Sequence, residues 1–156
     1  MTMNTSKEDT KKPVVLVVDD NLQNLELIMA YLEDVDCQTV SVSSGMEALD
    51  MISAQIPDLV LLDVMMPKIS GFEVCRRIKN DPKTAHIPVI MVTALNELAD
   101  IEKAINSGTD DFLSKPVNKW ELITRVKTML KLKHLSDRLE KTLAYLSEVE
   151  KATNPR

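Results

Sequence analysis

Several features that mark particular classes of protein are scarce or missing in this chain. Its 156 residues include only three glycines and two cysteines, and the sequence has no low-complexity tract and no internal repeat. No stretch approaches the roughly 18 consecutive apolar residues that a membrane-spanning helix needs, which argues against an integral membrane protein. Cys37 and Cys75 form neither a CxxC pair nor part of a metal-ligand cluster, so we interpret them as reduced packing residues.

Two further absences concern localisation and nucleic acids. Residues 1–12 are polar, carry mixed charge and lack the apolar segment of a secretory signal, which predicts a flexible N-terminal leader on a cytoplasmic protein. The formal net charge is -5, from 19 basic and 24 acidic residues. Because nucleic-acid binding depends on clustered lysine and arginine, we expect no direct binding of DNA or RNA, and no membrane association.

What the chain does contain is a regular alternation of apolar strands and amphipathic helices. Apolar runs predict five strands, at Val14–Val18, Gln38–Val42, Leu59–Asp63, Val89–Thr93 and Phe112–Ser114. Between them, apolar residues recur every three or four positions and predict helices over about residues 22–32, 45–56, 71–80 and 98–107. Connections of this length exclude hairpins, so the predicted fold class is α/β, with a doubly wound parallel sheet and helices on both faces.

Individual residues refine these helices. Asn21 is expected to cap the first helix, and Gly108 to end the fourth in a left-handed conformation. The apolar positions that we expect to cover the sheet include Leu22, Met46, Ile105 and Trp120.

Four of the predicted strands end in a side chain that can take part in chemistry. The first strand runs into Asp19 and Asp20, the third ends in Asp63, the fourth ends in Thr93, and the fifth leads to Lys115. The carboxyl ends of parallel strands share one edge of the sheet, which is where open α/β sheets bind ligands. The sequence therefore predicts one site that contains three acids, a hydroxyl and an ammonium group.

The three acids indicate a bound cation. Close carboxylates repel one another by about 4 kcal/mol per pair at an effective dielectric near 20, so they are not expected to share a site without positive charge. Oxygen ligands without histidine or cysteine suit Mg²⁺ better than Zn²⁺, and Mg²⁺ also recruits phosphate oxygens. With Lys115 and Thr93 opposite, the site could hold the oxygens of a phosphoryl group, which leaves Asp63 as the expected nucleophile.

These residues resemble the receiver domain of two-component response regulators. The resemblance rests on the pair Asp19-Asp20, the segment Leu61-Leu62-Asp63-Val64-Met65-Met66-Pro67 with Gly71 after it, Val92-Thr93-Ala94 and Lys115-Pro116, all in the family's order. It covers about residues 14–133. It implies the CheY-like, flavodoxin-like fold with strand order 2-1-3-4-5, and a protein that is phosphorylated rather than an enzyme in the ordinary sense.

The resemblance also implies a role for each acid. Asp63 would accept a phosphoryl group from the phosphohistidine of a sensor histidine kinase or phosphotransfer protein, or from a small donor such as acetyl phosphate. Asp20, Asp63 and the backbone carbonyl of Met65 would bind Mg²⁺ directly, and Asp19 would bind it through a water molecule. Slow autodephosphorylation would follow.

Four further positions acquire roles in the same way. Lys115 would pair with Asp63 and then with the phosphoryl group, and a cis peptide bond between Lys115 and Pro116 would aim the ammonium into the site. Thr93 would move toward the phosphate and Phe112 would turn inward behind it. This switch would reshape the face formed by the fourth helix, the fifth strand and the fifth helix.

Two positions beside the predicted site are apolar. Met65 lies two residues after Asp63, and Leu95 lies two residues after Thr93. The resemblance implies that these positions influence how water reaches the acyl phosphate. We therefore expect Met65 and Leu95 to slow hydrolysis and prolong the phosphorylated state.

The chain continues as one long helix from about residue 118 to residue 152. Beyond the part expected to cover the sheet, apolar residues step by three and four positions, at Leu132, Leu135, Leu139, Thr142, Leu146 and Val149. Such a stripe is typical of a coiled coil, and its simplest partner is a second copy of the chain. We expect a leader at 1–12, a receiver domain at 13–131, a helical extension at 132–152 and a tail at 153–156. A homodimer is expected through this helix or the switching face.

Three alternatives stay open at this point. The chain could be the N-terminal receiver part of a longer regulator with a cyclic-di-GMP or kinase output domain. A haloacid dehalogenase-like phosphatase also uses an aspartate nucleophile, but it needs an acid two residues later, where this chain has Met65. A kinase or phosphotransfer protein would need a reactive histidine, and neither His86 nor His134 has the expected neighbours.

Overall fold

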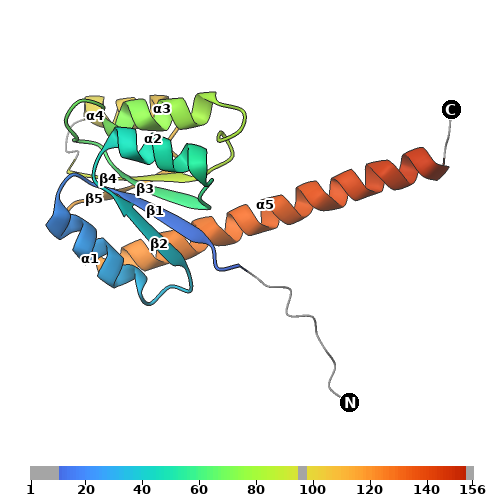
Figure 1. Cartoon of the computed structure of the whole chain (residues 1–156), viewed down its shortest axis with the longest axis horizontal. Coiled ribbons are helices and arrows are strands. Elements are labelled where there is room, and N and C mark those ends of the chain that lie inside the picture. The colour runs from blue at the N-terminus through green and yellow to red at the C-terminus, as the bar shows by residue number, and fades with distance from the viewer. Residues whose placement is uncertain (1–10, 95–97, 154–156) are drawn as a thin grey trace, which may run out of the picture.

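The structure is a computed structural model that describes residues 11–94 and 98–153 (Figure 1). Five strands form one parallel sheet in the order β2-β1-β3-β4-β5. They are β1 (Val14–Val18), β2 (Gln38–Val42), β3 (Leu59–Asp63), β4 (Val89–Thr93) and β5 (Asp111–Ser114). The helices are α1 (Leu22–Leu32), α2 (Gly45–Ala54), α3 (Gly71–Asn80), α4 (Leu98–Asn106) and α5 (Lys119–Thr153). The predicted fold class and strand order are confirmed, and β5 begins one residue earlier than predicted.

The sheet lies between two layers of helices, with α2, α3 and α4 on one face and α1 and α5 on the other (Figure 1). Alternate residues of each strand point to opposite faces. Leu16 and Leu62 thus join one core cluster, while Val17 and Leu61 join the other. Both faces are covered, which explains why the central strands are apolar at nearly every position.

The predicted residues at two helix ends are confirmed. Asn21 caps α1, since its side-chain Oδ1 accepts hydrogen bonds from the backbone N–H groups of Gln23 at 2.9 Å and Asn24 at 3.2 Å. Gly108 follows α4 with φ of 89°, the left-handed conformation that glycine adopts without steric cost. Among the described residues, no helix is long and apolar enough to cross a membrane.

The prediction of which apolar residues cover the sheet was wrong at four positions. Leu22 is 67% exposed, Met46 48%, Ile105 62% and Trp120 70%. On α5 the buried residues are Leu122, Ile123 and Val126, and a helix turns about 100° per residue, so Trp120 lies to the side of this buried face. Helical spacing identifies apolar positions, but it does not determine which of them lie over the sheet.

The long helix α5 continues far past the body of the domain (Figure 1). Every described residue from 138 to 153 is exposed. Where α5 leaves the body, the Lys133 Nζ lies 3.4 Å from Asp58 Oδ1 and 2.8 Å from Asp137 Oδ2. The other oxygen of Asp58 accepts a hydrogen bond from the Val14 N–H at 2.7 Å. A cluster of ion pairs therefore fixes the base of the extension to the amino ends of β1 and β3.

Candidate functional site

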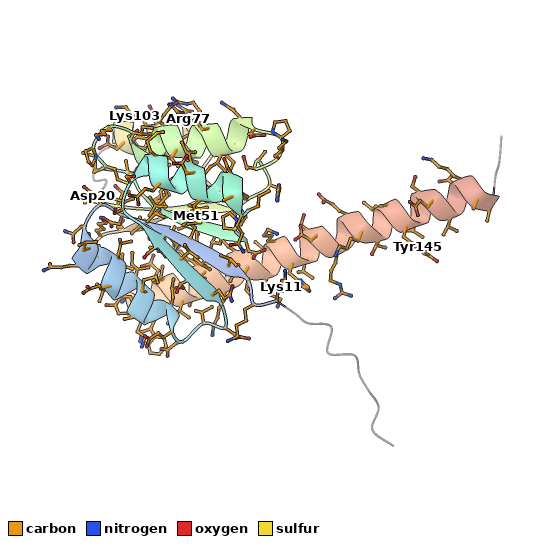
Figure 2. All side chains as sticks on the ribbon, viewed as in Figure 1. Lys11, Asp20, Met51, Arg77, Lys103 and Tyr145 are labelled. Atoms are coloured by element: carbon orange, nitrogen blue, oxygen red, sulfur yellow. The ribbon has the colours of Figure 1, made fainter. Side chains whose placement is uncertain are left out.

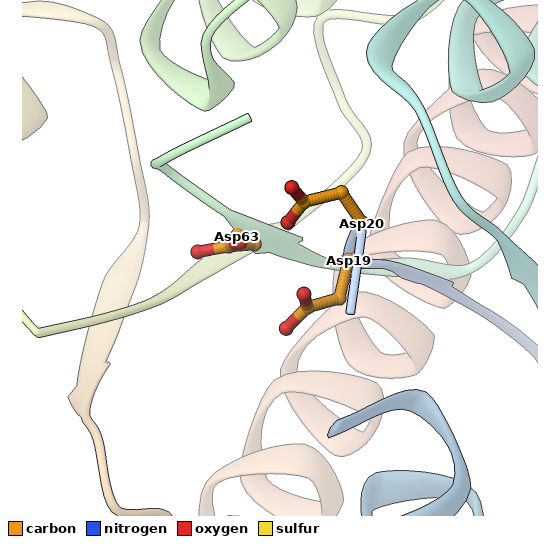
Figure 3. Close-up of side chains that lie close together, drawn as sticks. All are labelled: Asp19, Asp20 and Asp63. Carbon is orange, nitrogen blue, oxygen red and sulfur yellow. The ribbon is translucent and has the colours of Figure 1, made fainter. Parts of the chain in front are cut away.

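The carboxyl ends of β1, β3, β4 and β5 meet at one edge of the sheet, as the sequence predicts. The parallel register places Val18 beside Leu62, Asp63 beside Val92, and Thr93 beside Ser114. Asp19 and Asp20 directly follow β1, and Asp63 is the last residue of β3. Ligand oxygens of these three acids lie within 4.8 Å of one another (Figure 3).

The three carboxylates differ strongly in exposure. Asp19 is 1% exposed and Asp63 4%, whereas Asp20 is exposed at the mouth of the site. One oxygen of Asp19 accepts a hydrogen bond from the Asn21 backbone N–H at 2.9 Å. Asp63 Oδ1 accepts a longer one, of 3.4 Å, from the Met65 backbone N–H. Two buried carboxylates with few donors form a strongly electronegative pocket that opens to solvent beside Asp20.

Lys115 supplies the positive charge inside this pocket. Its Nζ lies 3.1 Å from Asp19 Oδ2 and 3.3 Å from Asp63 Oδ1. The backbone holds it there, because the Lys115 N–H donates to the Thr93 carbonyl at 2.9 Å. The predicted cis peptide bond between Lys115 and Pro116 is present. Burial alone lowers the pKa of Lys115, but Asp63 and Asp19 outweigh it, so this pKa is raised. Lys115 is therefore protonated and bridges the two buried acids.

One ammonium group does not balance the negative charge of the pocket. Burial raises the pKa of Asp63, and repulsion from Asp19 raises it further, while Lys115 and the Met65 N–H lower it. The net result is a pKa of about 6, against an ordinary value of 3.8. A carboxylate that resists ionisation in an acidic pocket indicates that a further positive charge is needed there.

The donor set of the pocket fits Mg²⁺. The candidate ligands are the oxygens of Asp19, Asp20 and Asp63, and the cluster contains no histidine or cysteine. Hard oxygen ligands at an exposed mouth leave room for the waters that Mg²⁺ retains. The uncompensated charge at Asp63 is a second, independent reason to expect a cation at this position.

A model of the response regulator receiver domain matches residues 15–127 of the chain. The chain belongs to this family. The response regulator PleD of Caulobacter vibrioides is 42% identical over 125 residues, which cover 80% of this chain and 28% of PleD. The polar-differentiation response regulator DivK of Brucella ovis is 37% identical over 116 residues, 74% of this chain and 94% of DivK.

Solved receiver structures agree with the fold. The receiver domain of a signal transduction histidine kinase from Syntrophus aciditrophicus superposes with a TM-score of 0.73 at 35% identity, covering 76% of this chain and 90% of that one. This receiver chain spans only 28% of the length of PleD. Receiver domains are phosphoacceptors rather than enzymes of the usual kind, and the family uses Mg²⁺.

The remaining predicted residues of this receiver lie as follows. Thr93 ends β4 and is 2% exposed, and Phe112 lies on β5 with 38% of its surface exposed. Met65 is 72% exposed at the rim of the site, so it is not a core packing residue. Leu95 lies outside the described residues.

Gly71 is a residue whose role sequence reasoning missed. It was predicted only to begin a helix, but a Cβ atom at Gly71 would lie 2.2 Å from the Asp63 carbonyl oxygen and 2.7 Å from Val64 Cα. The first turn of α3 thus packs directly against the backbone that carries the phosphoacceptor candidate. Nothing short of the fold itself reveals this contact, because it depends on how the 64–70 loop returns to the strand.

The Thr93 hydroxyl is buried without a hydrogen-bond partner in the part of the chain that the structure describes. A buried hydroxyl that lacks a partner costs about 1–3 kcal/mol. We therefore expect Thr93→Val, which keeps the shape and removes the hydroxyl, to raise the free energy of unfolding by about 1 kcal/mol in urea denaturation. Thr84→Val is the matched control.

The Thr84 hydroxyl is also buried but donates to the Ile78 carbonyl at 2.7 Å. Its removal should lower the free energy of unfolding by about 1 kcal/mol, the opposite sign. If Thr93→Val destabilises the fold as much as Thr84→Val does, the Thr93 hydroxyl has a partner in the resting protein and is not held ready for a ligand.

Proposed function

We propose that this receiver is a phosphorylation-activated response regulator whose acceptor is Asp63. The observation that carries the proposal is the Asp63 carboxylate, 4% exposed, 3.3 Å from Lys115 and beside two further acids. Such a group is poorly stabilised as a free anion, and conversion to an acyl phosphate moves the charge outward to oxygens that Lys115 and Thr93 can bind. The donor is a sensor histidine kinase or a phosphotransfer protein.

The site would hold Mg²⁺ through Asp20, Asp63 and the Met65 carbonyl, with Asp19 acting through water. When bound, Mg²⁺ neutralises the acidic pocket and charge on the transferring phosphoryl group. The chain itself positions the reacting groups. Strands β1 and β3 fix the carboxylates, and the backbone hydrogen bond from the Lys115 N–H to the Thr93 carbonyl fixes the ammonium group.

The transfer itself follows from these positions. An oxygen of the ionised Asp63 attacks phosphorus, a P–O bond forms, and the P–N bond of the donor phosphohistidine breaks and leaves a neutral imidazole after protonation. With acetyl phosphate, the leaving group is acetate. Lys115, already protonated, stabilises the negative charge on a phosphoryl oxygen without giving up its proton.

The phosphoryl group would then act as a switch. Thr93 has a hydroxyl free for a new bond to a phosphoryl oxygen, given its lack of a partner among the described residues. Movement of Thr93 would open space behind it, into which Phe112 on β5 turns. We propose that this changes the face formed by α4, β5 and α5, through contacts that favour one of two existing conformations.

The coarse features of the whole protein are also proposals. The protein acts in the cytoplasm, binds neither nucleic acid nor membrane directly, and consists of the segments 1–12, 13–131, 132–152 and 153–156 described above. It forms a homodimer through α5 or the α4-β5-α5 face. A cyclic-di-GMP or kinase output domain on a longer protein is a less favoured alternative, as is a phosphatase of the haloacid dehalogenase type.

Mass spectrometry tests the proposed function directly. Incubation of the chain with acetyl phosphate and Mg²⁺ should add one phosphoryl group of about 80 Da, and peptide mapping should place it on Asp63. Omission of Mg²⁺ or addition of a chelator should prevent it. A modification on any other residue, or none with donors that phosphorylate a known receiver in parallel, would contradict the proposal.

Met65 gives a prediction about the lifetime of the phosphorylated state. Its side chain is 72% exposed at the rim of the site, where it can shield the acyl phosphate from water. Met65→Asn, alone or with a polar residue in place of Leu95, should shorten the half-life of phosphorylated Asp63 by between about threefold and tenfold. A tenfold change corresponds to about 1.4 kcal/mol of activation free energy, so the expected change in the barrier is smaller than that.

The half-life can be followed by loss of the added mass after the donor is removed. Met46→Asn is a suitable control, because Met46 is also exposed, at 48%, but lies on α2. An unchanged or longer half-life in Met65→Asn would show that this side chain does not restrict water.

A further inference from the structure

The extension of α5 carries an apolar stripe that no described residue covers. The stripe consists of Leu132, Leu135, Leu139, Thr142, Leu146 and Val149, which we call the seam. Its five aliphatic members are between 39% and 59% exposed. Figure 2 shows side chains of this segment, Tyr145 among them, extending away from the helix and clear of the body.

A helix in this situation needs a partner. Isolated helices are marginal in water, and most helical stability in proteins comes from packing an apolar face. From residue 138 to 153 the chain has no buried residue, so its own domain supplies no such packing. The hydrogen bonds formed there by Thr142 and Thr153 stay within the helix.

The seam is narrow, which favours two helices over a larger bundle. Its members alternate in steps of three and four, as the a and d positions of a coiled coil do. The positions that flank the seam are mostly polar, and only Leu143 and Tyr145 widen it; the polar ones are Lys131, Ser136, Arg138 and Glu150. An a and d stripe whose flanks are mostly polar matches the contact area between two helices.

The face of α5 that carries the seam continues onto the body, where its residues are polar. Thr128 precedes Leu132 by four residues, and Glu121, Thr124 and Arg125 precede Thr128 by seven, four and three, so all of them share one face of α5. Together with Trp120, Met129 and Asp111 they line a hollow of about 460 Å³ beside β5. Trp120, 70% exposed, is the second residue of α5 and precedes the start of the seam by 12 residues.

We propose that two copies of the chain pair through the seam as a parallel, in-register coiled coil. In the parallel arrangement, each seam residue meets its own counterpart, so no charged residue enters the contact and the leucine layers remain leucine layers. The two bodies then lie at the same end, where the hollows beside Trp120 approach each other. An antiparallel pair would leave both hollows and both Trp120 side chains exposed.

The pairing through the seam does not require phosphorylation. Residues Asp63 and Lys115 lie at the carboxyl edge of the sheet, whereas α5 leaves the body beside Asp58, at the amino end of β3. The Asp63→Asn variant should therefore remain a dimer. Conversely, a variant that cannot pair should still accept a phosphoryl group, so failure of either proposal leaves the other testable.

Sedimentation and light scattering of the full chain test the pairing. At tens of micromolar, the wild type should have twice the mass of the 17.5 kDa chain. Leu139→Lys places a charge in the seam and should give a monomer, with at least a tenfold weaker association. Ala144→Lys adds the same charge on the opposite side of the helix and should remain dimeric.

Cysteine cross-linking tests the orientation. In a background with Cys37→Ser, the single variants Leu135→Cys and Val149→Cys should each form a disulfide-linked dimer on mild oxidation, because like positions meet only in a parallel pair. Glu148→Cys, on the outer side, is the control and should not. Cross-linking that requires mixing Leu135→Cys with Leu146→Cys would overturn the parallel arrangement, a fourfold mass would overturn the pair, and a monomeric wild type would overturn both.

Discussion

Asp63→Asn is expected to abolish phosphoryl uptake and, at the same time, to stabilise the fold. The amide cannot act as the nucleophile, so the added mass of about 80 Da should disappear. The stabilisation follows from the raised pKa of Asp63, about 6 against 3.8, caused first by burial and then by Asp19. Above pH 6, Asp63 is ionised in the folded state, and this buried charge destabilises the fold.

The stabilisation by Asp63→Asn is expected to depend on pH. A carboxyl group whose pKa is higher in the folded state favours folding while it is protonated, and this contribution is lost as the pH rises from about 4 to about 6. Two pKa units correspond to about 3 kcal/mol at most. In a chelator, Asp63→Asn should therefore exceed the wild type in unfolding free energy by about 2 kcal/mol at pH 7.5, and by close to nothing at pH 4.

Urea denaturation at the two pH values measures this difference. Asp50→Asn, an exposed aspartate on α2, is the control and should change the unfolding free energy little at either pH. Mg²⁺ should stabilise the wild type and leave Asp63→Asn nearly unaffected. If Asp63→Asn is no more stable than the wild type at pH 7.5 in chelator, then the Asp63 charge is already compensated in the resting protein.

Gly71→Ala is expected to have the largest effect on stability. The added Cβ would lie 2.2 Å from the Asp63 carbonyl oxygen and 2.9 Å from the Asp63 carbonyl carbon, both backbone atoms in the centre of the sheet. No rotamer change can relieve such contacts, so α3 or the end of β3 must move. Overpacking of this kind costs about 3 kcal/mol or more.

The same substitution at Gly45 is a close control. Both glycines are the first residues of their helices and follow a serine cap, Ser44 or Ser70. At Gly45 the nearest atom to the added Cβ is the Val74 side-chain Cγ2, at 2.9 Å, which can shift more easily than backbone. Gly45→Ala should cost about 1 kcal/mol or less, partly offset by the helix preference of alanine. Equal costs for the two variants would contradict this account.

The strands and the site were predictable from the sequence for the same reason. A strand covered on both faces must be apolar throughout, so an apolar run that stops at Asp63 or Thr93 identifies both the strand and its carboxyl end. Parallel connections then bring these ends together. The approach of Asp19, Asp20 and Asp63 to within 4.8 Å agrees with that reasoning, while their roles in phosphoryl transfer stay predictions.

Other features depended on information that local sequence does not carry. Trp120 and Leu122 are equally plausible core residues by type, and only the angle at which α5 crosses the sheet leaves one exposed and the other buried. The contact of Gly71 with the backbone of Asp63 and the ion pair between Lys133 and Asp58 join segments 8 and 75 residues apart, respectively. Such contacts follow from the assembled fold.

The ion pair between Lys133 and Asp58 fixes the orientation of the protruding part of α5 relative to the sheet. Asp58 immediately precedes β3 and Asp63 ends it, so the two are about 17 Å apart along one stiff, buried segment of backbone. Whatever the far tip of α5 contacts is therefore held at a fixed distance and in a fixed direction from Asp63. Breaking this anchor, for example with Lys133→Met, would leave the chemistry intact but let the tip swing.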